Sequence, residues 1–229
     1  MKKKIIIATI KSWNLNNAKQ FKKRCSNKYS VLIIDKKEDL NYRKIAKFNP
    51  GYIFFPHWSW MIPKSIFENF ECVVFHMTDL PFGRGGSPLQ NLVSRGIKRT
   101  RISAIKVGKE LDAGPVYMKI DLNLNGSATD IYKKTAEIVF GKIIPVIISG
   151  ETVPVPQKGR AVIFKRRSSL ESDISGLRSA NKVFDWIRML DAEGYPAAFI
   201  ESEGLKIEFY NAKLYGKYVT ATAKIKVKR

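Results

Sequence analysis

The chain has 229 residues, of which 45% are hydrophobic and 11% aromatic, and this composition excludes an intrinsically disordered protein. Lysine and arginine number 41 against 20 acidic residues, so the formal net charge of +21 favours anionic partners such as nucleic acid, acidic membranes or phosphorylated small molecules. The lysines are spread along the chain, and an ordinary lysine-rich, solvated surface explains the charge about equally well.

The cysteines and the N-terminal segment bear on metal binding and location. Cys25 and Cys72 are the only cysteines and there are two histidines, so no zinc-site spacing can be drawn and we expect no metal and reduced thiols. Residues 2–10 resemble a signal peptide, but the apolar run ends at Lys11 and no small-residue cleavage site follows. We interpret this segment as a buried strand and expect a cytoplasmic protein, because no other run approaches a membrane span.

Short apolar runs alternate with helical patterns through the first part of the chain. Strands are predicted at 4–10, 29–34, 52–55 and 71–75, and helices at 14–23, 40–47 and 64–69. Asn14 is the expected N-cap of the first helix, and Asn49-Pro50-Gly51 ends the second. Such alternation predicts an α/β fold with a Rossmann-like, largely parallel, doubly wound sheet.

The second part of the chain changes character near Gly150. Before it we predict a helix at 90–94, strands at 102–106 and 116–122, and a long helix at 130–148 that Pro145 should kink or end. After a connecting segment at 153–159, we predict strands at 161–165, 205–210 and 218–227 and a helix at 179–192. We therefore expect a Rossmann-like domain over residues 1–155 and a small unit of a helix plus a β-hairpin over residues 156–229.

One histidine and one aspartate are the strongest candidates for chemistry. His76 directly follows the apolar run 72–75, so it should lie at a strand end, where a parallel sheet delivers side chains into a cleft. Asp112 lies in the turn Leu111-Asp112-Ala113-Gly114-Pro115. A near-neutral base beside a carboxylate is a proton-transfer pair. A hydrogen-bonded strand-end histidine and a simple turn aspartate remain alternatives, because the two residues are 36 positions apart.

Two further segments are candidates for binding a flat ligand. Gly83–Pro88 is glycine-rich and precedes a helix, but it lacks both the Lys-Ser/Thr ending of a P-loop and the spacing of a dinucleotide fingerprint. We interpret it as a flexible loop whose backbone approaches a planar ligand. Residues 54–63 are dense in aromatics, which indicates either core packing or a wall for a heterocycle, with His57 as a further candidate residue.

Together these motifs resemble the N10-formyltetrahydrofolate-dependent formyltransferases, a family that includes methionyl-tRNA formyltransferase and the sugar N-formyltransferases. The family pattern of Asn-x-His, Leu-Pro, Arg-Gly, Pro and Leu-Asp-x-Gly-Pro corresponds here to His76, Leu80-Pro81, Arg84-Gly85, Pro88 and residues 111–115. Residues 187–191 and 194–199 look like the helix and turn that follow in the family.

One position departs from the family pattern. Val74 stands where the family has asparagine, and loss of such an oxyanion donor typically costs ~10²–10³ in rate unless it is replaced. Three explanations stay open: His76 with backbone amides suffices, a nearby polar residue substitutes, or the activity is degenerate.

The resemblance implies an N-formyltransferase that uses N10-formyltetrahydrofolate as co-substrate and no metal. An amine would attack the formyl carbon, His76 would donate to the oxyanion or shuttle a proton, and Asp112 would orient His76 and help take the amine's proton. The residues expected to bind the folate are Trp60, Met61, Ile62, Pro63, Arg84, Gly85 and Gly86. Those expected to bind the acceptor are Lys11, Trp13, Asn14, Thr78 and Pro81, although the first three also fit a capped helix start.

The acceptor is expected from the length of the C-terminal part. About thirty residues follow Phe199, too few for the five-stranded barrel of the tRNA enzymes, so the resemblance points to the sugar branch. The run from His76 to Gln90 is similar to formyltransferases of pseudaminic-acid-type pathways, which implies a UDP-linked 4-amino-4,6-dideoxy sugar as partner beside folate. We expect neither nucleic acid nor membrane as a partner, and leave a homodimer open. The alternatives are a methionyl-tRNA formyltransferase-like enzyme and a degenerate, basic RNA-binding relative.

Overall fold

The computed structural model describes residues 2–228, which form two compact units, each assembled from several segments of the chain. Unit 1 comprises the residues up to 84, residues 101–122 and residues 133–163. Unit 2 comprises residues 85–100, residues 123–132 and the residues from 164 onwards. The domain division expected after residue 155 stays a prediction.

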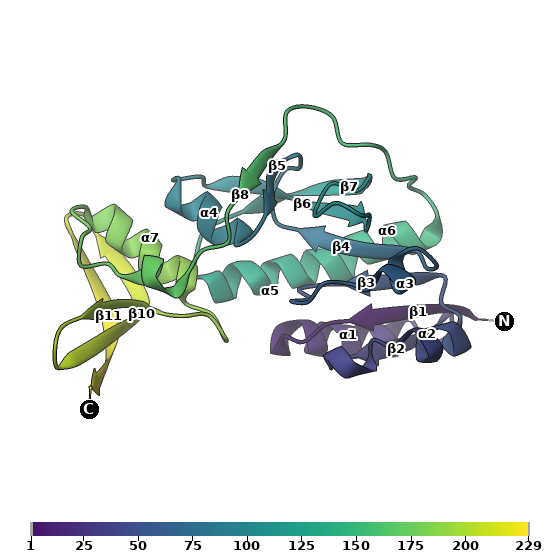
Figure 1. Ribbon diagram of the computed structural model, residues 1–229, viewed down its shortest axis with the longest axis horizontal. Coiled ribbons are helices and arrows are strands. Elements are labelled where there is room, and N and C mark those ends of the chain that lie inside the picture. Colours follow the sequence, from purple (N-terminus) through teal and green to yellow (C-terminus); the bar gives the residue numbers. More distant parts are fainter. Residues whose placement is uncertain (1, 229) are drawn as a thin grey trace. The chain divides into compact units, whose positions relative to one another are not determined.

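A six-stranded sheet is the centre of the α/β fold, in the order β2-β1-β3-β4-β6-β7 (Figure 1). Its strands are β1 (Lys3–Ala8), β2 (Tyr29–Ile34), β3 (Tyr52–Phe55), β4 (Cys72–His76), β6 (Arg99–Lys106) and β7 (Val116–Asn123). The first four strands run parallel, and β6 pairs antiparallel with β4. The expected largely parallel α/β sheet is therefore confirmed.

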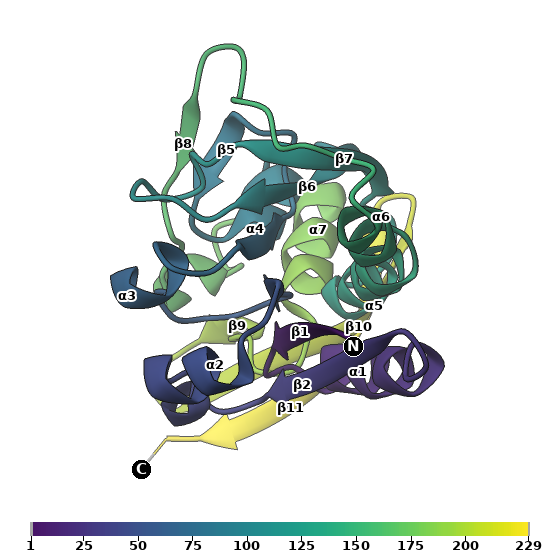
Figure 2. The same ribbon diagram turned by 90° about the vertical axis from the view of Figure 1, so that its right-hand side faces the viewer.

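Helices cover both faces of this sheet in unit 1. α2 (Tyr42–Phe48) and α3 (Lys64–Phe67) bury Ile45 and Ile66 in a cluster with Ile53 of β3. α1 (Ser12–Arg24) and α6 (Ile144–Ser149) lie on the opposite side (Figure 2). Because β1 is covered on both faces, residues 5–8 are all buried, as in other sandwiched parallel strands.

The first helix begins earlier than expected. It starts at Ser12, and the residue at its N-cap position is Lys11, whose side chain makes no capping hydrogen bond. The prediction of Asn14 as N-cap is therefore wrong: Asn14 lies inside the helix and is buried. By contrast, Asn41 caps α2, since its Oδ1 accepts hydrogen bonds from the backbone amides of Arg43 and Lys44.

The long helix predicted at 130–148 is three consecutive helical segments. α5 (Ala128–Ile138) runs into a π-helical turn, Val139–Ile143, which leads into α6. Pro145 is the second residue of α6 and has no amide hydrogen to donate to the carbonyl four residues earlier. The change of hydrogen-bond register just before Pro145 accommodates that missing donor.

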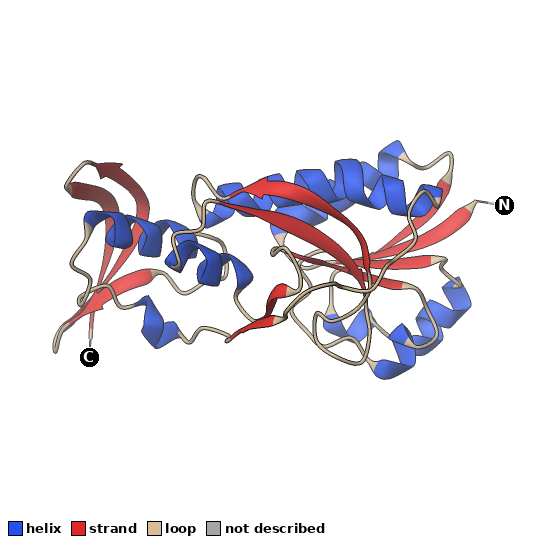
Figure 3. Ribbon diagram, turned by 90° about the horizontal axis from the view of Figure 1, so that it is seen from above, coloured by secondary structure: helices blue, strands red, loops and turns tan. Residues whose placement is uncertain are grey.

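Unit 2 contains a small antiparallel sheet, in the order β11-β10-β9. Its strands are β9 (Ala198–Glu201), β10 (Leu205–Tyr215) and β11 (Tyr218–Val227), and α7 (Ala180–Leu190) packs against β10 (Figure 3). The expected helix and hairpin are present, and β9 adds a strand that the sequence pattern did not predict. α4 (Pro88–Ser94) also belongs to this unit and contacts α7.

The glycine-rich segment forms regular structure where a flexible loop was expected. β5 (Phe82–Gly85) and β8 (Val162–Phe164) make a two-stranded sheet. Gly83 and Gly85 have positive φ values of 78° and 103°, so these glycines let the backbone turn while it pairs.

Two general properties bear on location and redox chemistry. Within residues 2–228, no helix has the length and apolar character that crossing a membrane requires. Cys25 and Cys72 are both free thiols, and burial raises the pKa of Cys72 to about 12, so that thiol is unreactive.

Candidate active site

His76 is the last residue of β4, and its ring lies between two hydrogen-bond acceptors. Nδ1 is 3.5 Å from Oδ2 of Asp112, and Nε2 is 2.7 Å from the carbonyl oxygen of Gly83. The side chains of His76 and Asp112 are only 9% and 13% exposed. A neutral imidazole can donate to only one of the two acceptors, whereas the imidazolium donates to both. The structure thus brings together the two groups proposed to move protons.

The turn that carries Asp112 depends on a close backbone approach. A Cβ atom on Gly114 would lie 1.8 Å from the carbonyl oxygen of Lys106, so no other residue fits there without a shift of the backbone. The amide of Lys106 donates to the carbonyl of Pro115 at 2.8 Å, which joins the two ends of the turn. Asp112 itself has a left-handed φ of 53°. The Leu-Asp-x-Gly-Pro signature therefore has a steric reason for its glycine.

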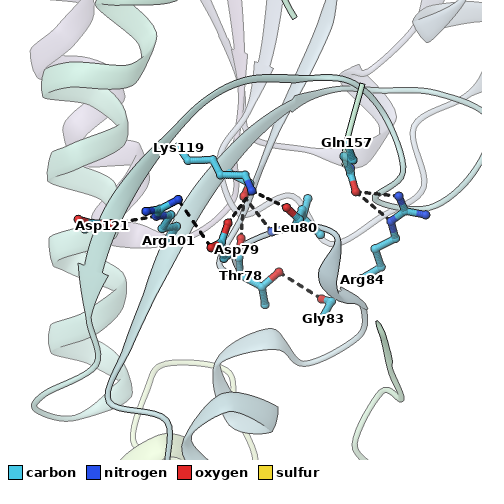
Figure 4. A network of polar contacts seen from close by, with 10 residues as sticks. Thr78, Asp79, Leu80, Gly83, Arg84, Arg101, Lys119, Asp121 and Gln157 are labelled. Atoms are coloured by element: carbon cyan, nitrogen blue, oxygen red, sulfur yellow. Dashed lines mark hydrogen bonds and ion pairs between the residues drawn. The ribbon is translucent and has the colours of Figure 1, made fainter. Parts of the chain in front are cut away.

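The segment after His76 is braced from within and from β6. Thr78 is fully buried, and its Oγ1 donates to the carbonyl of Gly83 at 3.3 Å (Figure 4). Oγ of Ser103 donates to the carbonyl of Thr78 at 2.7 Å and accepts from the amide of Leu80 at 3.3 Å. These contacts hold the Gly83 carbonyl against His76. The proposed contact of Thr78 with the acceptor stays a prediction, because its hydroxyl is engaged in this loop.

A chain of charged side chains holds the outer side of the same loop. Nζ of Lys119 donates at 2.5 Å both to Oδ1 of Asp79 and to the carbonyl of Leu80 (Figure 4). Arg101 lies between two carboxylates: its Nη1 is 3.7 Å from Oδ2 of Asp79, and its Nε is 3.0 Å from Oδ1 of Asp121. Exposed ion pairs of this kind contribute little each. The backbone contact of the partly buried Lys119 gives this group a structural role.

Arg84 is connected to the Asp112 turn through a residue that sequence reasoning missed. Nε and Nη2 of Arg84 donate to Oε1 of Gln157 at 3.0 and 2.8 Å (Figure 4). Nε2 of Gln157 donates to the carbonyls of Asp112 and Gly114 at 2.8 and 2.9 Å. Gln157 lies in the connecting segment, where no sequence pattern marks it. Ser103 in β6 and Lys119 in β7 were also missed, because no sequence pattern marks them either.

The aromatic segment before α3 exposes apolar side chains. Trp60 is 37% and Met61 is 77% exposed, while Ile62 packs against the core cluster and Pro63 precedes α3. The rings of Trp58 and Trp60 meet edge to face with centroids 4.9 Å apart. This surface offers a planar heterocycle apolar contact, and the assignment of Trp60–Pro63 to folate stays a prediction.

Gly85 and Gly86, the other expected folate contacts, belong to unit 2. The amide of Gly86 donates to the carbonyl of Phe164 at 3.0 Å. A Cβ atom on Gly86 would lie 2.5 Å from Cβ of Arg166, so a glycine is needed for this backbone approach. The structure thus gives Gly86 a packing role, and a role in binding folate stays a prediction.

The residues expected to bind the acceptor make internal contacts in unit 1. Nδ2 of Asn14 donates to the carbonyl of Pro56 at 3.4 Å, and Trp13 meets the ring of His57 edge to face at 5.7 Å. Nζ of Lys11 lies 5.9 Å from the centroid of the Trp13 ring. Pro81 follows a cis peptide bond, and its carbonyl accepts from the amide of Val162 at 3.1 Å. Their contacts with an acceptor stay predictions.

His57 and Val74 are the two other positions that the sequence singled out. Burial, and then the charge of Lys11, lowers the pKa of His57 to about 4, so its ring is neutral at physiological pH. Val74 pairs with Phe55 and Ile105 in the sheet and packs against Leu80. The position of the family's asparagine is thus occupied by a side chain that suits its apolar surroundings. Within residues 2–228, no group of three histidine, cysteine, aspartate or glutamate side chains could hold a metal ion.

Comparison with known proteins gives consistent matches. Residues 169–226 match a family described as methionyl-tRNA formyltransferase, C-terminal domain. A structure described as methionyl-tRNA formyltransferase from Clostridium thermocellum is 50% identical, with a TM-score of 0.97, over 99% of this chain and 100% of that one. HypX from Aquifex aeolicus, solved in complex with tetrahydrofolic acid, is 16% identical with a TM-score of 0.74 over 91% of this chain and 37% of that one, which shows likeness of fold alone.

The curated relatives are longer than this chain. The methionyl-tRNA formyltransferase of Bacillus cytotoxicus is 24% identical over 182 residues, which cover 76% of this chain and 57% of that protein. The chain therefore matches less than three fifths of the length of that relative.

Proposed function

This chain belongs to the formyltransferase family, and on that basis we propose that it transfers the formyl group of N10-formyltetrahydrofolate to the amino group of methionyl-tRNA. The nucleotide-linked amino sugar expected from the sequence is contradicted, because the 50% identical structure and the curated relatives are methionyl-tRNA formyltransferases. The expectation that nucleic acid is no partner is corrected for the same reason. The Clostridium thermocellum chain is covered over 100% of its length, so chain length was a poor guide to the acceptor.

The observation that carries the proposal is the placement of His76 between Asp112 and the Gly83 carbonyl. The amine of the acceptor attacks the formyl carbon, so a C–N bond forms and the carbonyl oxygen becomes an oxyanion. As the oxyanion forms, Nε2 of His76 turns from the Gly83 carbonyl to donate to it, and the Asp112 carboxylate orients the ring and accepts the proton that the amine loses. The bond from carbon to N10 then breaks, and the relayed proton ends on N10.

The site supplies fewer side-chain donors than the family pattern. Val74 has no polar group, so the oxyanion depends on the His76 ring and on backbone amides. Backbone amides are effective donors in such sites because they are fixed before the reaction begins. The braces from Ser103 and Lys119 on residues 78–83 support this, because they hold the backbone beside His76 rigid.

The charge of the chain supports a nucleic-acid acceptor. Residues 1–34 contain nine basic residues and no acidic residue. On α1 the side chains of Lys19, Lys22 and Lys23 are exposed, and none of them forms an ion pair in the described part of the chain. Uncompensated lysines of this kind attract a phosphodiester backbone and release its counterions.

Formyl transfer itself tests the proposal. The full chain is incubated with N10-formyltetrahydrofolate and methionyl-tRNA, and formylmethionyl-tRNA is quantified after hydrolysis of the ester. We expect turnover with this acceptor and none with uncharged tRNA or with a UDP-linked amino sugar. Turnover of the amino sugar alone, or of neither acceptor, would refute the proposal.

A further inference from the structure

Gln157 is held between two points where its segment is fixed to unit 1. The backbone of Val155 pairs with Val116 at the start of β7, through hydrogen bonds of 2.9 and 2.7 Å. Further along, the amide of Val162 donates to the carbonyl of Pro81 at 3.1 Å. The connecting segment therefore crosses the site along a defined path, and the Gln157 side chain starts from a fixed backbone.

The hydrogen-bonding capacity of the Gln157 amide is filled. Its oxygen accepts two hydrogen bonds from Arg84, and its nitrogen donates to the carbonyls of Asp112 and Gly114. A primary amide offers two donors and two acceptor lone pairs, so the four contacts use all of them. A side chain this fully engaged is fixed in one orientation.

We infer that Gln157 is a positioning residue that locks the Asp112 turn and joins it to Arg84, so that the Asp112 carboxylate stays against His76. The backbone of Asp112 is left-handed, a conformation that aspartate adopts less readily than glycine, and external hydrogen bonds help to hold it. Gln157 supplies two of them, one at Asp112 and one two residues later. Without them, the turn can relax and carry the carboxylate away from the imidazole.

The chemistry of the contacts selects an amide at this position. A carboxylate would keep the pair with Arg84 but would place an oxygen against two carbonyl oxygens. A lysine would satisfy the carbonyls but would repel the Arg84 guanidinium. Only a side chain with both donors and acceptors can join a guanidinium to two carbonyls, and glutamine has that group at the required reach.

Amide hydrogen exchange tests this positioning role of Gln157 without any assay of activity. We expect exchange over residues 109–116 to become about tenfold faster in Gln157→Ala and in Gln157→Glu, because the turn loses its external donors. Gln20→Ala, at an exposed position of α1, is the matched control and should leave exchange in that segment unchanged. Unchanged exchange in folded Gln157→Ala and Gln157→Glu would overturn the inference.

A kinetic cycle then tests whether Gln157 acts through Asp112, and this arm rests on the proposed function. Gln157→Ala should lower kcat by ~10–10²-fold, with KM for both substrates nearly unchanged, because the carboxylate is misplaced after substrate has bound. In an Asp112→Asn background the same substitution should cost nothing further. A full additional loss would overturn the inference, whereas a wild-type chain inactive on methionyl-tRNA would refute the proposed function and leave the exchange result to decide.

Discussion

The Nδ1 atom of His76 lies 3.5 Å from Oδ2 of Asp112, although His76 ends β4 and Asp112 lies in the turn between β6 and β7. In the proposed reaction this pair stabilises the oxyanion and accepts the amine's proton. We therefore expect His76→Ala and Asp112→Asn each to lower kcat by ~10²–10⁴-fold, the usual contribution of a positioned acid or base.

Steady-state formylation of methionyl-tRNA measures this effect. Asp121→Asn is the matched control, because its carboxylate is 88% exposed and, among residues 2–228, its one ion pair is with Arg101 at the surface. The control should retain wild-type kcat. Full activity of folded His76→Ala would contradict the assignment of catalysis to this pair.

The second quantitative prediction concerns the close approach of Gly114 to the backbone of Lys106. Because a Cβ atom on Gly114 would lie 1.8 Å from the Lys106 carbonyl oxygen, Gly114→Ala must displace the backbone of the turn. We expect the free energy of unfolding to fall by ~2–4 kcal/mol, in the range of other strained substitutions. Gly108→Ala is the control, since an added Cβ there meets nothing within 4 Å.

Urea unfolding at neutral pH compares the two alanine variants. If Gly114→Ala is as stable as Gly108→Ala, the steric account of the Leu-Asp-x-Gly-Pro signature is wrong.

The sheet was predictable because apolar runs separated by polar breakers mark buried strands. The strands at 29–34, 52–55 and 218–227 have the predicted bounds. The π-helical turn at 139–143 was not predictable, because a helical period does not reveal a single change of hydrogen-bond register. β5 and β9 were missed because each has only four residues, and the partner of β5, β8, lies far along the chain.

The candidate site was predictable only where residue type itself carries chemistry. His76 and Asp112 could be named from their signatures. Gln157 and Ser103 could not, because most of their partners are backbone groups, which no sequence pattern distinguishes. The acceptor was assigned wrongly because the length of the chain after Phe199 says nothing about the chemistry of the site.

His57 makes the chain sensitive to acid. Its pKa is lowered to about 4 by burial first and by Lys11 second, against 6.5 for an ordinary histidine. Between these values the unfolded chain binds more protons than the folded one, so stability is full above pH 6.5 and falls as the pH drops towards 4. At pH 5 the loss should be about 2 kcal/mol relative to neutral pH.

His57→Asn removes this titration and suits the left-handed backbone at position 57, where φ is 55°. Urea unfolding of both proteins at pH 7.5 and pH 5 should show that the wild type loses about 2 kcal/mol more than the variant. Equal losses would show that His57 is not the group responsible.

The exposed lysines of α1 make the last prediction. Lys19, Lys22 and Lys23 face solvent on a helix that has no acidic residue in its first turn, within a 34-residue stretch that has none at all. If they contact tRNA phosphates, raising the salt concentration from 50 to 200 mM should weaken methionyl-tRNA binding by ~10²-fold for about four contacts. Replacing all three lysines by glutamine should reduce the slope of that salt dependence by the amount that corresponds to about three phosphate contacts. The kcat value should stay unchanged, because the helix is not part of the reacting pair.

The matched control replaces three lysines on a different helical stretch, Lys133, Lys134 and Lys142, by glutamine and so removes the same net charge. An equal reduction of the slope in this control would show that the overall charge, and not the face of α1, attracts the tRNA.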